Sequence, residues 1–253
     1  MHRVLFSVGS LTIYSYGVLL ATGFIIAAFV ARERFKEQYK DPDIILDFVL
    51  AAVVGGIVGA RLAYVFGHWS DFSKNPGKIF ALNMEGLVFY GGLALGLGLV
   101  LIVGYVKKVR FWYILDLAGL CVPLALAIGR VGCLLNGCCY GKPTSLPWGI
   151  TYPAASGIIG ARHPTQIYEL ILDLALFGIL WWKRDSFARE GTVFWIFVMG
   201  YGLIRFTVEF FREHAQSFAG VGFQAGSIAL VVIAAAVLVF RYRLLPASGS
   251  EIL

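Results

Sequence analysis

Seven long apolar stretches constrain the fold of this chain more than any other feature of its sequence. Each contains roughly 17–25 mostly apolar residues, the length that an α-helix needs to cross the hydrocarbon core of a bilayer. The stretches do not alternate polar and apolar residues as the strands of a membrane barrel do, so we expect helices that satisfy their own backbone in lipid. The predicted spans are residues 11–31, 44–67, 86–106, 111–134, 165–182, 191–211 and 226–245.

The composition excludes a water-soluble protein of this length. The 253 residues are 59% hydrophobic and only 14% charged, so a soluble domain would lack the polar surface to cover itself. We therefore predict an all-α membrane protein that forms one polytopic domain over residues 1–253, with short extracytoplasmic loops at about 68–85, 138–163 and 212–225. The first apolar stretch is too long for a cleavable signal peptide, and we expect it to remain as a helix.

Lysine and arginine are distributed unevenly between the two sets of loops. Twelve lie on one side of the predicted membrane and six on the other. The positive-inside rule places the richer side in the cytoplasm, so we expect the N-terminus outside, the C-terminus in the cytoplasm and a multi-pass protein of the inner or plasma membrane. The net charge of +6 then reflects membrane orientation, and nothing in the sequence indicates a nucleic-acid partner.

Three arginines, Arg61, Arg130 and Arg205, lie within or at the ends of apolar spans, toward the outer side of the predicted topology. An arginine in hydrocarbon costs at least about 2.5–3.5 kcal/mol on insertion scales. One alternative is that these side chains simply reach the lipid head groups from helix ends, which suits Arg61 best. Arg205 lies deeper and has Glu209 four residues later, so we favour one anion-binding cluster.

The sixth span carries a polar stripe. Tyr201, Arg205, Glu209 and Arg212 follow one another at spacings of four, four and three residues, which places them on one face of a helix. A structural ion ladder between helices is the alternative interpretation. Ionisable residues inside a membrane are costly enough that a functional site is the default hypothesis.

The fourth span ends in an unusual segment, "GRVGCLLNGCCYGKPT", residues 129–144. An asparagine and several glycines follow the arginine here. Glycine allows a ligand to approach the backbone closely, and backbone N–H groups can bind anions. We therefore expect Asn136, Gly137 and Gly141 to line a polar pocket that receives the head group of a lipid.

The four cysteines permit several interpretations. Cys121 lies within an apolar span and is expected to be a small packed side chain. For Cys133, Cys138 and Cys139, packing or free thiols rank first. A bridge between Cys133 and Cys138 in an oxidising compartment ranks second, and a metal site ranks last because the spacing does not demand one.

The segment "RHPTQIYE" leads into the fifth span. Gln166 and Glu169 are three residues apart and share one helix face, which slightly favours the lining of a polar cavity over a helix cap. His163 is a candidate base or, equally, a loop anchor. Elsewhere, Gly55 and Gly59 are spaced for close helix packing.

A second glycine pair, Gly92 and Gly96, has the same spacing in the third span and suggests the same close packing of helices. Gly91, next to this pair, is less clear. A glycine there either packs against another helix or opens the backbone to a ligand. The sequence leaves these two alternatives open.

Six motifs in order resemble those of the bacterial prolipoprotein diacylglyceryl transferase family: "YSYG", "GARLAYV", "FYGG", "GRVGCLLNG", "RHPTQIYE" and "YGLIRFTVEFFRE". The resemblance implies transfer of a diacylglyceryl group from phosphatidylglycerol to the lipobox cysteine thiol of a prolipoprotein signal peptide, with release of glycerol phosphate. It implies a site in the bacterial inner membrane, among membrane lipids, without cofactor or metal. The residues implied by the motifs are Tyr16, Arg61, Arg130, Asn136, Gly141, Tyr201, Arg205 and Glu209.

The sequence departs from the family pattern at three places. Tyr14 begins the first motif, and Tyr90 precedes the glycine pair of the third, where the family usually has histidine. Cys133 and Cys138 replace polar residues in the signature of the fourth span. These departures leave the general base open, and they leave room for a paralogue that uses phospholipid with another acceptor.

The chemistry assigns roles to the charged residues. Arg130 and Arg205 would neutralise the leaving phosphate, Arg61 would position the head group, and Glu209 would hold Arg205. A free thiol is only about 3% thiolate at pH 7, and tyrosine is a poor base. We therefore expect the arginines to activate the thiol, with Tyr90 orienting the substrate or relaying a proton.

The remaining predicted contacts to substrate come from Tyr16, Tyr201, His163 and Gln166. A non-catalytic phospholipid-binding or transport protein is the rival interpretation. A transporter needs polar groups that continue through the inner halves of the helices, and the sequence has few of them.

Overall fold

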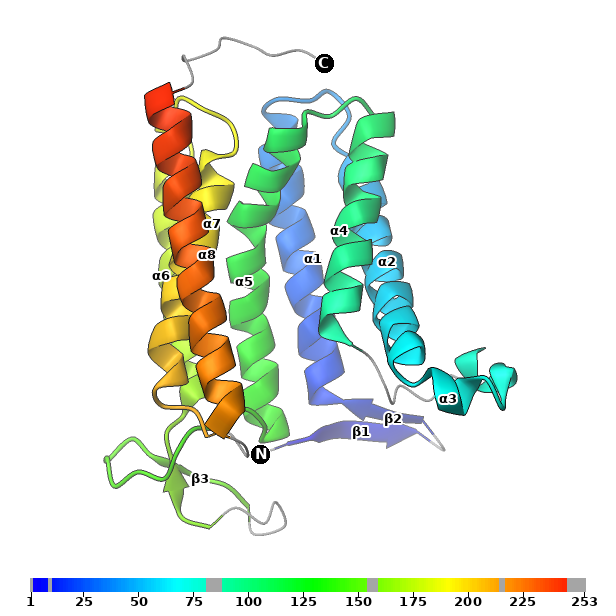
Figure 1. Ribbon diagram of the computed structural model, residues 1–253, viewed down its shortest axis with the longest axis vertical. Coiled ribbons are helices and arrows are strands. Elements are labelled where there is room, and N and C mark those ends of the chain that lie inside the picture. The colour runs from blue at the N-terminus through cyan, green and yellow to red at the C-terminus, as the bar shows by residue number, and fades with distance from the viewer. Residues whose placement is uncertain (1, 9–10, 81–87, 154–158, 214–216, 245–253) are drawn as a thin grey trace. The chain divides into compact units, whose positions relative to one another are not determined.

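The computed structural model describes residues 2–8, 11–80, 88–153, 159–213 and 217–244. Seven helices in these ranges are long and apolar enough to cross a membrane, which confirms the predicted all-α membrane fold. They are α1 Ser15–Lys36, α2 Ile44–Gly67, α4 Phe89–Val106, α5 Phe111–Asn136, α6 Thr165–Lys183, α7 Thr192–Glu209 and α8 Ser217–Leu244 (Figure 1).

The short elements lie between these helices. They are β1 Val4–Val8, β2 Leu11–Tyr14, α3 Trp69–Phe72, the 3₁₀ helix η1 Pro76–Phe80, β3 Ile150–Thr151 and β4 Ala161–Arg162. The strands form two small antiparallel pairs, β1 with β2 and β3 with β4. The second pair folds the loop between α5 and α6 back on itself.

The start of the first span is a correction to the sequence prediction. Residues 11–14 are strand β2, in which Thr12 pairs with Ser7 of β1, and the helix begins only at Ser15. The backbone N–H of Ser15 donates to the carbonyl oxygen of Arg3, 3.1 Å away. A hydropathy window counts apolar residues and does not register this pairing, so it extends the helix too far.

Two other boundaries also differ. The outer loop predicted at 212–225 is shorter, because α8 already begins at Ser217. The third span was predicted from residue 86; residues 86–87 lie outside the described ranges, and α4 begins at Phe89. The remaining spans agree with the prediction to within a few residues.

The chain divides into two compact units. The first comprises Met1–Ala31 and Leu115–Glu251, and the second holds Arg32–Ile114. In the first unit α6, α7 and α8 lie side by side (Figure 1). Glycines set the close contacts: a Cβ on Gly119 of α5 would lie 2.8 Å from the Phe194 backbone of α7, and one on Gly202 of α7 would meet the Ser227 carbonyl of α8.

In the second unit α2 packs against α4 through the predicted glycines. A Cβ on Gly55 would lie 2.8 Å from the Cα of Gly96. A Cβ on Gly59 would collide with the carbonyl of Gly91, and one on Gly92 would collide with α2 in the same way. Gly91, whose role the sequence left open, is therefore a packing residue, because its own Cβ would strike α2.

One polar residue inside a span has a structural role that its sequence position did not reveal. Asp116 lies near the start of α5. In the structure its carboxylate accepts hydrogen bonds from the backbone N–H groups of Gly191, 2.6 Å, and Phe194, 2.9 Å. Asp116 thus satisfies the free N–H groups at the start of α7, a helix distant in sequence.

Candidate functional site

Three arginines of the first unit converge on one buried carboxylate. Glu169 of α6 is 1% exposed. Its Oε1 accepts from Arg205 Nη1 at 2.9 Å and from Arg212 Nη1 at 3.3 Å, and its Oε2 forms an ion pair with Arg130. We call these four residues, with Glu209, the arginine cluster.

The second carboxylate of the arginine cluster is Glu209. It is buried one turn after Arg205 on α7, and its Oε2 lies 3.1 Å from Arg205 Nη2. This is the contact that the spacing on the sixth span predicts. Arg205 is therefore held by carboxylates from two helices, which fixes the orientation of its planar guanidinium group.

The arginine cluster combines three guanidinium groups with two carboxylates. A third buried carboxyl group, that of Asp173, also experiences the charges of Arg130 and Arg205. The side chains of Arg130 and Arg205 are each 15% exposed, whereas that of Glu169 is 2% exposed. The carboxylates thus lie behind the arginines, and the arginines retain surface that an anionic ligand can reach.

Arg212 lies on the polar stripe predicted for the sixth span, but it is not among the residues to which the sequence assigns a role. It follows the apolar part of that span. The backbone of Arg212 forms an isolated antiparallel bridge with Gly141, and the N–H of Lys142 donates to the Phe211 carbonyl at 2.8 Å. This pairing turns the end of α7 toward the loop after α5 and brings Arg212 to Glu169.

Asp173 is a second residue to which the sequence assigned no role. It lies one turn beyond Glu169 on α6 and is completely buried. Neither of its carboxylate oxygens has a hydrogen-bond partner among the described residues. Unsatisfied buried polar groups are rare in native proteins, so this one needs an explanation. The charges of Arg130 and Arg205 both act on it.

The loop after α5 is tied to the start of α6. Gly137 adopts a left-handed φ of 72° directly after Asn136, the last residue of α5, as is usual at the end of a helix. The side chain of Gln166 then donates to the carbonyl of Cys138, and that of Thr165 to the carbonyl of Cys139, both at 2.6 Å. The first turn of α6 thereby fixes the two cysteines.

Several predicted ligand groups are used by the protein itself. The N–H of Gly141 donates to the His163 carbonyl at 2.8 Å, so this donor is engaged within the loop. The Nδ1 of His163 lies 3.1 Å from the Tyr168 hydroxyl, and its ring lies 5.2 Å from that of Phe211. These contacts match the loop-anchoring alternative for His163. Gln166 is likewise buried against the Tyr152 hydroxyl.

The two tyrosines predicted from the first and sixth spans lie around Arg130. Tyr16 packs against Gly132 of α5, and the charge of Arg130 acts on it. Tyr201 stacks on Phe197, with ring centroids 5.9 Å apart, and the charges of Arg205 and Arg130 act on its hydroxyl.

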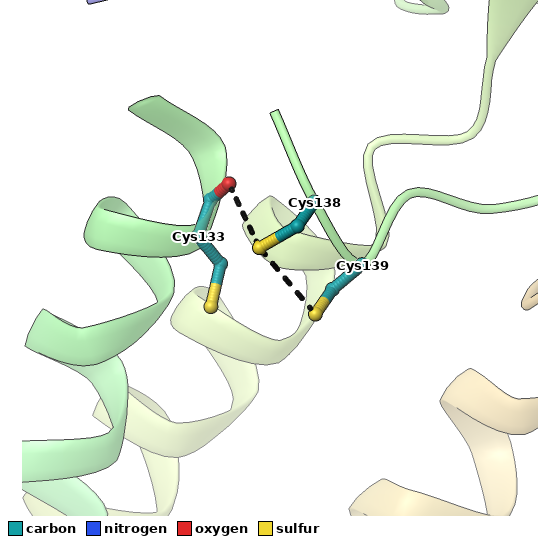
Figure 2. Close-up of side chains that lie close together, drawn as sticks. All are labelled: Cys133, Cys138 and Cys139. Atoms are coloured by element: carbon teal, nitrogen blue, oxygen red, sulfur yellow. Dashed lines mark hydrogen bonds between the residues drawn. The ribbon is translucent and has the colours of Figure 1, made fainter. Parts of the chain in front are cut away.

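The thiols of Cys133, Cys138 and Cys139 form a cluster in which every pair of sulfur atoms lies within 4.8 Å (Figure 2). All four cysteines are free, so the bridge between Cys133 and Cys138 is not formed. Cys121 is buried, as predicted. Hydrogen bonds from the two neighbouring thiols, and then the charges of Arg212 and Arg130, lower the pKa of Cys139.

Two predicted site residues belong to the second unit. Arg61 donates from Nε to the Ile79 carbonyl at 3.1 Å and from Nη2 to the Lys78 carbonyl at 2.7 Å, so it holds η1 against α2. Tyr90, at the start of α4, is 69% exposed. A common site for these residues and Arg130 stays a prediction.

Comparison with known proteins agrees with the motifs. Residues 3–242 match the family described as prolipoprotein diacylglyceryl transferase. Proteins called phosphatidylglycerol–prolipoprotein diacylglyceryl transferase are similar to this chain. The one from Geobacter sulfurreducens is 38% identical over 217 residues, which cover 83% of this chain and 82% of the relative. The one from Clostridium tetani is 36% identical over 248 residues, which cover 95% and 97%. The chain therefore belongs to the prolipoprotein diacylglyceryl transferase family.

Proposed function

We propose that this chain transfers the diacylglyceryl group of phosphatidylglycerol to the lipobox cysteine thiol in the signal peptide of a prolipoprotein, and releases glycerol phosphate. The observation that carries the proposal is the convergence of Arg130, Arg205 and Arg212 on the buried Glu169. The names of the relatives support both substrates. No nucleic acid takes part.

The reaction requires charge stabilisation at the leaving group. The acceptor sulfur attacks the glyceryl carbon that bears the phosphate, a carbon–sulfur bond forms, and the carbon–oxygen bond breaks. Its electron pair moves to the phosphate oxygen, so negative charge grows there. Fixed donors aimed at such charge each contribute about 10²–10³ in rate, and Arg130 and Arg205 are the donors in this proposal.

The carboxylates prepare these donors. Glu169 and Glu209 hold Arg205 from two sides, so the guanidinium group does not need to reorganise as charge develops. Arg61 would position the lipid head group, and Tyr90 would orient the acceptor. Tyr16, Tyr201, Asn136 and Gly137 would complete the contacts with the substrates.

The proposed location is the bacterial inner membrane, with the arginine cluster toward the outer surface. The excess of lysine and arginine in one set of loops supports this orientation. The C-terminus would then lie in the cytoplasm. A signal peptide that crosses the membrane presents its cysteine at the outer surface, where the predicted site lies.

The test uses the purified full-length chain in nanodiscs that contain phosphatidylglycerol, with a lipobox peptide as acceptor. We expect glycerol phosphate release and a peptide whose mass has increased by one diacylglyceryl group. A peptide with serine in place of the cysteine should give neither product. Release with another nucleophile would indicate a paralogous transferase, and lipid binding without release would indicate a transport or binding protein; either result contradicts the proposal.

A further inference from the structure

The three clustered thiols form an arrangement that the proposed reaction does not yet use. Cys133 lies on the last turn of α5, and Cys138 and Cys139 follow the left-handed turn at Gly137. Figure 2 shows the three sulfur atoms turned toward the same small space. The sulfur atoms of Cys138 and Cys139 are 3.8 Å apart, and all three lie within 4.8 Å of one another.

These separations fit a metal site better than a disulfide. A tetrahedral zinc site has zinc–sulfur bonds of about 2.3 Å, so its sulfur atoms are about 3.8 Å apart. A disulfide requires sulfur atoms at about 2.05 Å, and adjacent cysteines rarely meet its geometry. The sequence ranked a metal last because spacing alone did not demand one. The structure adds the third sulfur from α5, which the spacing did not predict.

The surroundings hold the sulfur atoms in place. The carbonyls of Cys138 and Cys139 accept hydrogen bonds from Gln166 and Thr165, both at 2.6 Å. Cys139 adopts a left-handed φ of 64°, which is unusual for a residue other than glycine. Support of this kind, from residues behind the ligands, orients them in metal sites.

The charges also match. Zinc bound by three thiolates carries a net charge of −1. Arg212 and Arg130 both act on Cys139. A negatively charged metal site would therefore have positively charged groups beside it.

We propose that Cys133, Cys138 and Cys139 bind one zinc ion and leave its fourth position open for the sulfur of the acceptor cysteine. The first half of this proposal stands on the geometry of the thiols, and the second half rests on the proposed function. Zinc sites with three protein ligands and an open position are typical of catalysis, whereas structural sites are closed by four.

The open position would activate the acceptor. A thiol that coordinates zinc loses its proton, which passes to water. The lone pair of the bound sulfur forms the bond to the glyceryl carbon, and the electrons of the broken carbon–oxygen bond leave with glycerol phosphate. The product is a neutral thioether, which is a weaker ligand than the thiolate. It dissociates, and the zinc site returns to its original charge state. Zinc would thus activate the acceptor thiol in a chain that has tyrosine, and not histidine, at residue 90.

The first experiment measures metal binding by the whole protein. The purified chain is stripped with a chelator, reloaded with zinc alone and analysed for metal content and free thiols. We expect one zinc per chain. Cys133→Ser, Cys138→Ser and Cys139→Ser should each weaken zinc binding by about 100-fold or more, whereas Cys121→Ala, a cysteine outside the cluster, should bind as the wild type does.

Two outcomes overturn the metal site. One is a reloaded wild-type chain that holds no zinc while three thiols of the cluster remain free. The other is a bridge between Cys133 and Cys138 found by mass spectrometry of the unreduced protein. Both are read on the wild-type chain, so a variant that fails to fold does not affect them.

The second experiment tests the open position with cobalt(II), which reports thiolate ligands by its absorption. Addition of the lipobox peptide should change the spectrum, and the serine peptide should not. An unchanged spectrum, or full transferase activity in zinc-free protein, overturns the acceptor role and leaves the proposed function standing. Zinc binding without glycerol phosphate release in any condition contradicts the proposed function instead.

Discussion

Arginines inside apolar spans meet different partners in the two units of this protein. In the first unit, Arg130 and Arg205 converge on the buried carboxylate of Glu169. In the second, Arg61 donates to backbone carbonyls of η1, and its guanidinium carbon lies 5.4 Å from the centre of the Phe72 ring. An arginine in an apolar span carries an insertion cost in either unit. The comparison shows that the insertion cost identifies arginines that have a role. The partners of each arginine then show whether that role is charge chemistry or the support of a loop.

The largest expected effect follows from removing an arginine of the cluster. Arg130→Gln and Arg205→Gln should each lower kcat for glycerol phosphate release by about 10²–10³ or more, since each removes a donor to the leaving phosphate. Arg32→Gln is the matched control, because Arg32 pairs with Asp43 at an exposed position. Equal losses in the control and the cluster variants would show that the assay reports damage to the fold.

The next effect concerns the shared carboxylate. Glu169→Gln leaves three arginines without their common partner, and breaking a buried ion pair typically lowers the free energy of unfolding by about 3–5 kcal/mol. We expect a lower melting temperature together with reduced activity. A variant with wild-type stability would mean that Glu169 does not organise the arginines.

A smaller effect is expected in the second unit. Arg61→Gln should raise KM for phosphatidylglycerol about 10- to 100-fold with kcat nearly unchanged, if Arg61 contributes a charged hydrogen bond to the head group. A fall in kcat as deep as that of Arg130→Gln would erase the contrast between the two units. An unchanged KM would leave Arg61 with its loop contacts alone.

Tyr90→Phe should reduce activity only about fivefold, because it removes one neutral hydrogen bond worth about 1 kcal/mol. The readout is kcat/KM across the pH range. If activity vanishes as completely as in Arg130→Gln, a proton-transfer role for Tyr90 replaces the electrostatic account of thiol activation.

The smallest effect is a shift in the titration of Cys139 in metal-free protein. Because neighbouring thiols and arginines lower its pKa, the thiolate should persist below the pH at which an ordinary cysteine is protonated, and disappear only as the pH falls further. Alkylation by iodoacetamide, followed by mass spectrometry, measures this. Arg212→Gln should move the midpoint to higher pH, and Arg32→Gln should not.

The sequence predicted the helices well because hydropathy is a local property. Five of the seven spans begin and end near the predicted residues, the exceptions being α1 and α8, and the glycines of α2 and α4 pack as their spacing indicates. The start of α1 failed because the pairing of β2 with β1 is a contact that composition does not encode. The role of Asp116 could not be predicted for a similar reason, since its partners lie at the start of α7.

The candidate site was predicted in part. The i+4 spacing revealed the contact between Arg205 and Glu209, and the shared face of Gln166 and Glu169 hinted at a polar interior. The central position of Glu169 was not predictable, because it depends on which helices meet. Arg212 belongs to the predicted polar stripe, but its contact with Glu169 accompanies a pairing with Gly141 that the spacing does not show.

The most direct test of the central claim is a structure of the chain with phosphatidylglycerol bound. The account predicts phosphate oxygens within hydrogen-bond distance, about 2.7–3.2 Å, of the guanidinium groups of both Arg130 and Arg205. A phosphate bound away from both arginines, with the two guanidinium groups still engaged only by Glu169 and Glu209, would contradict it.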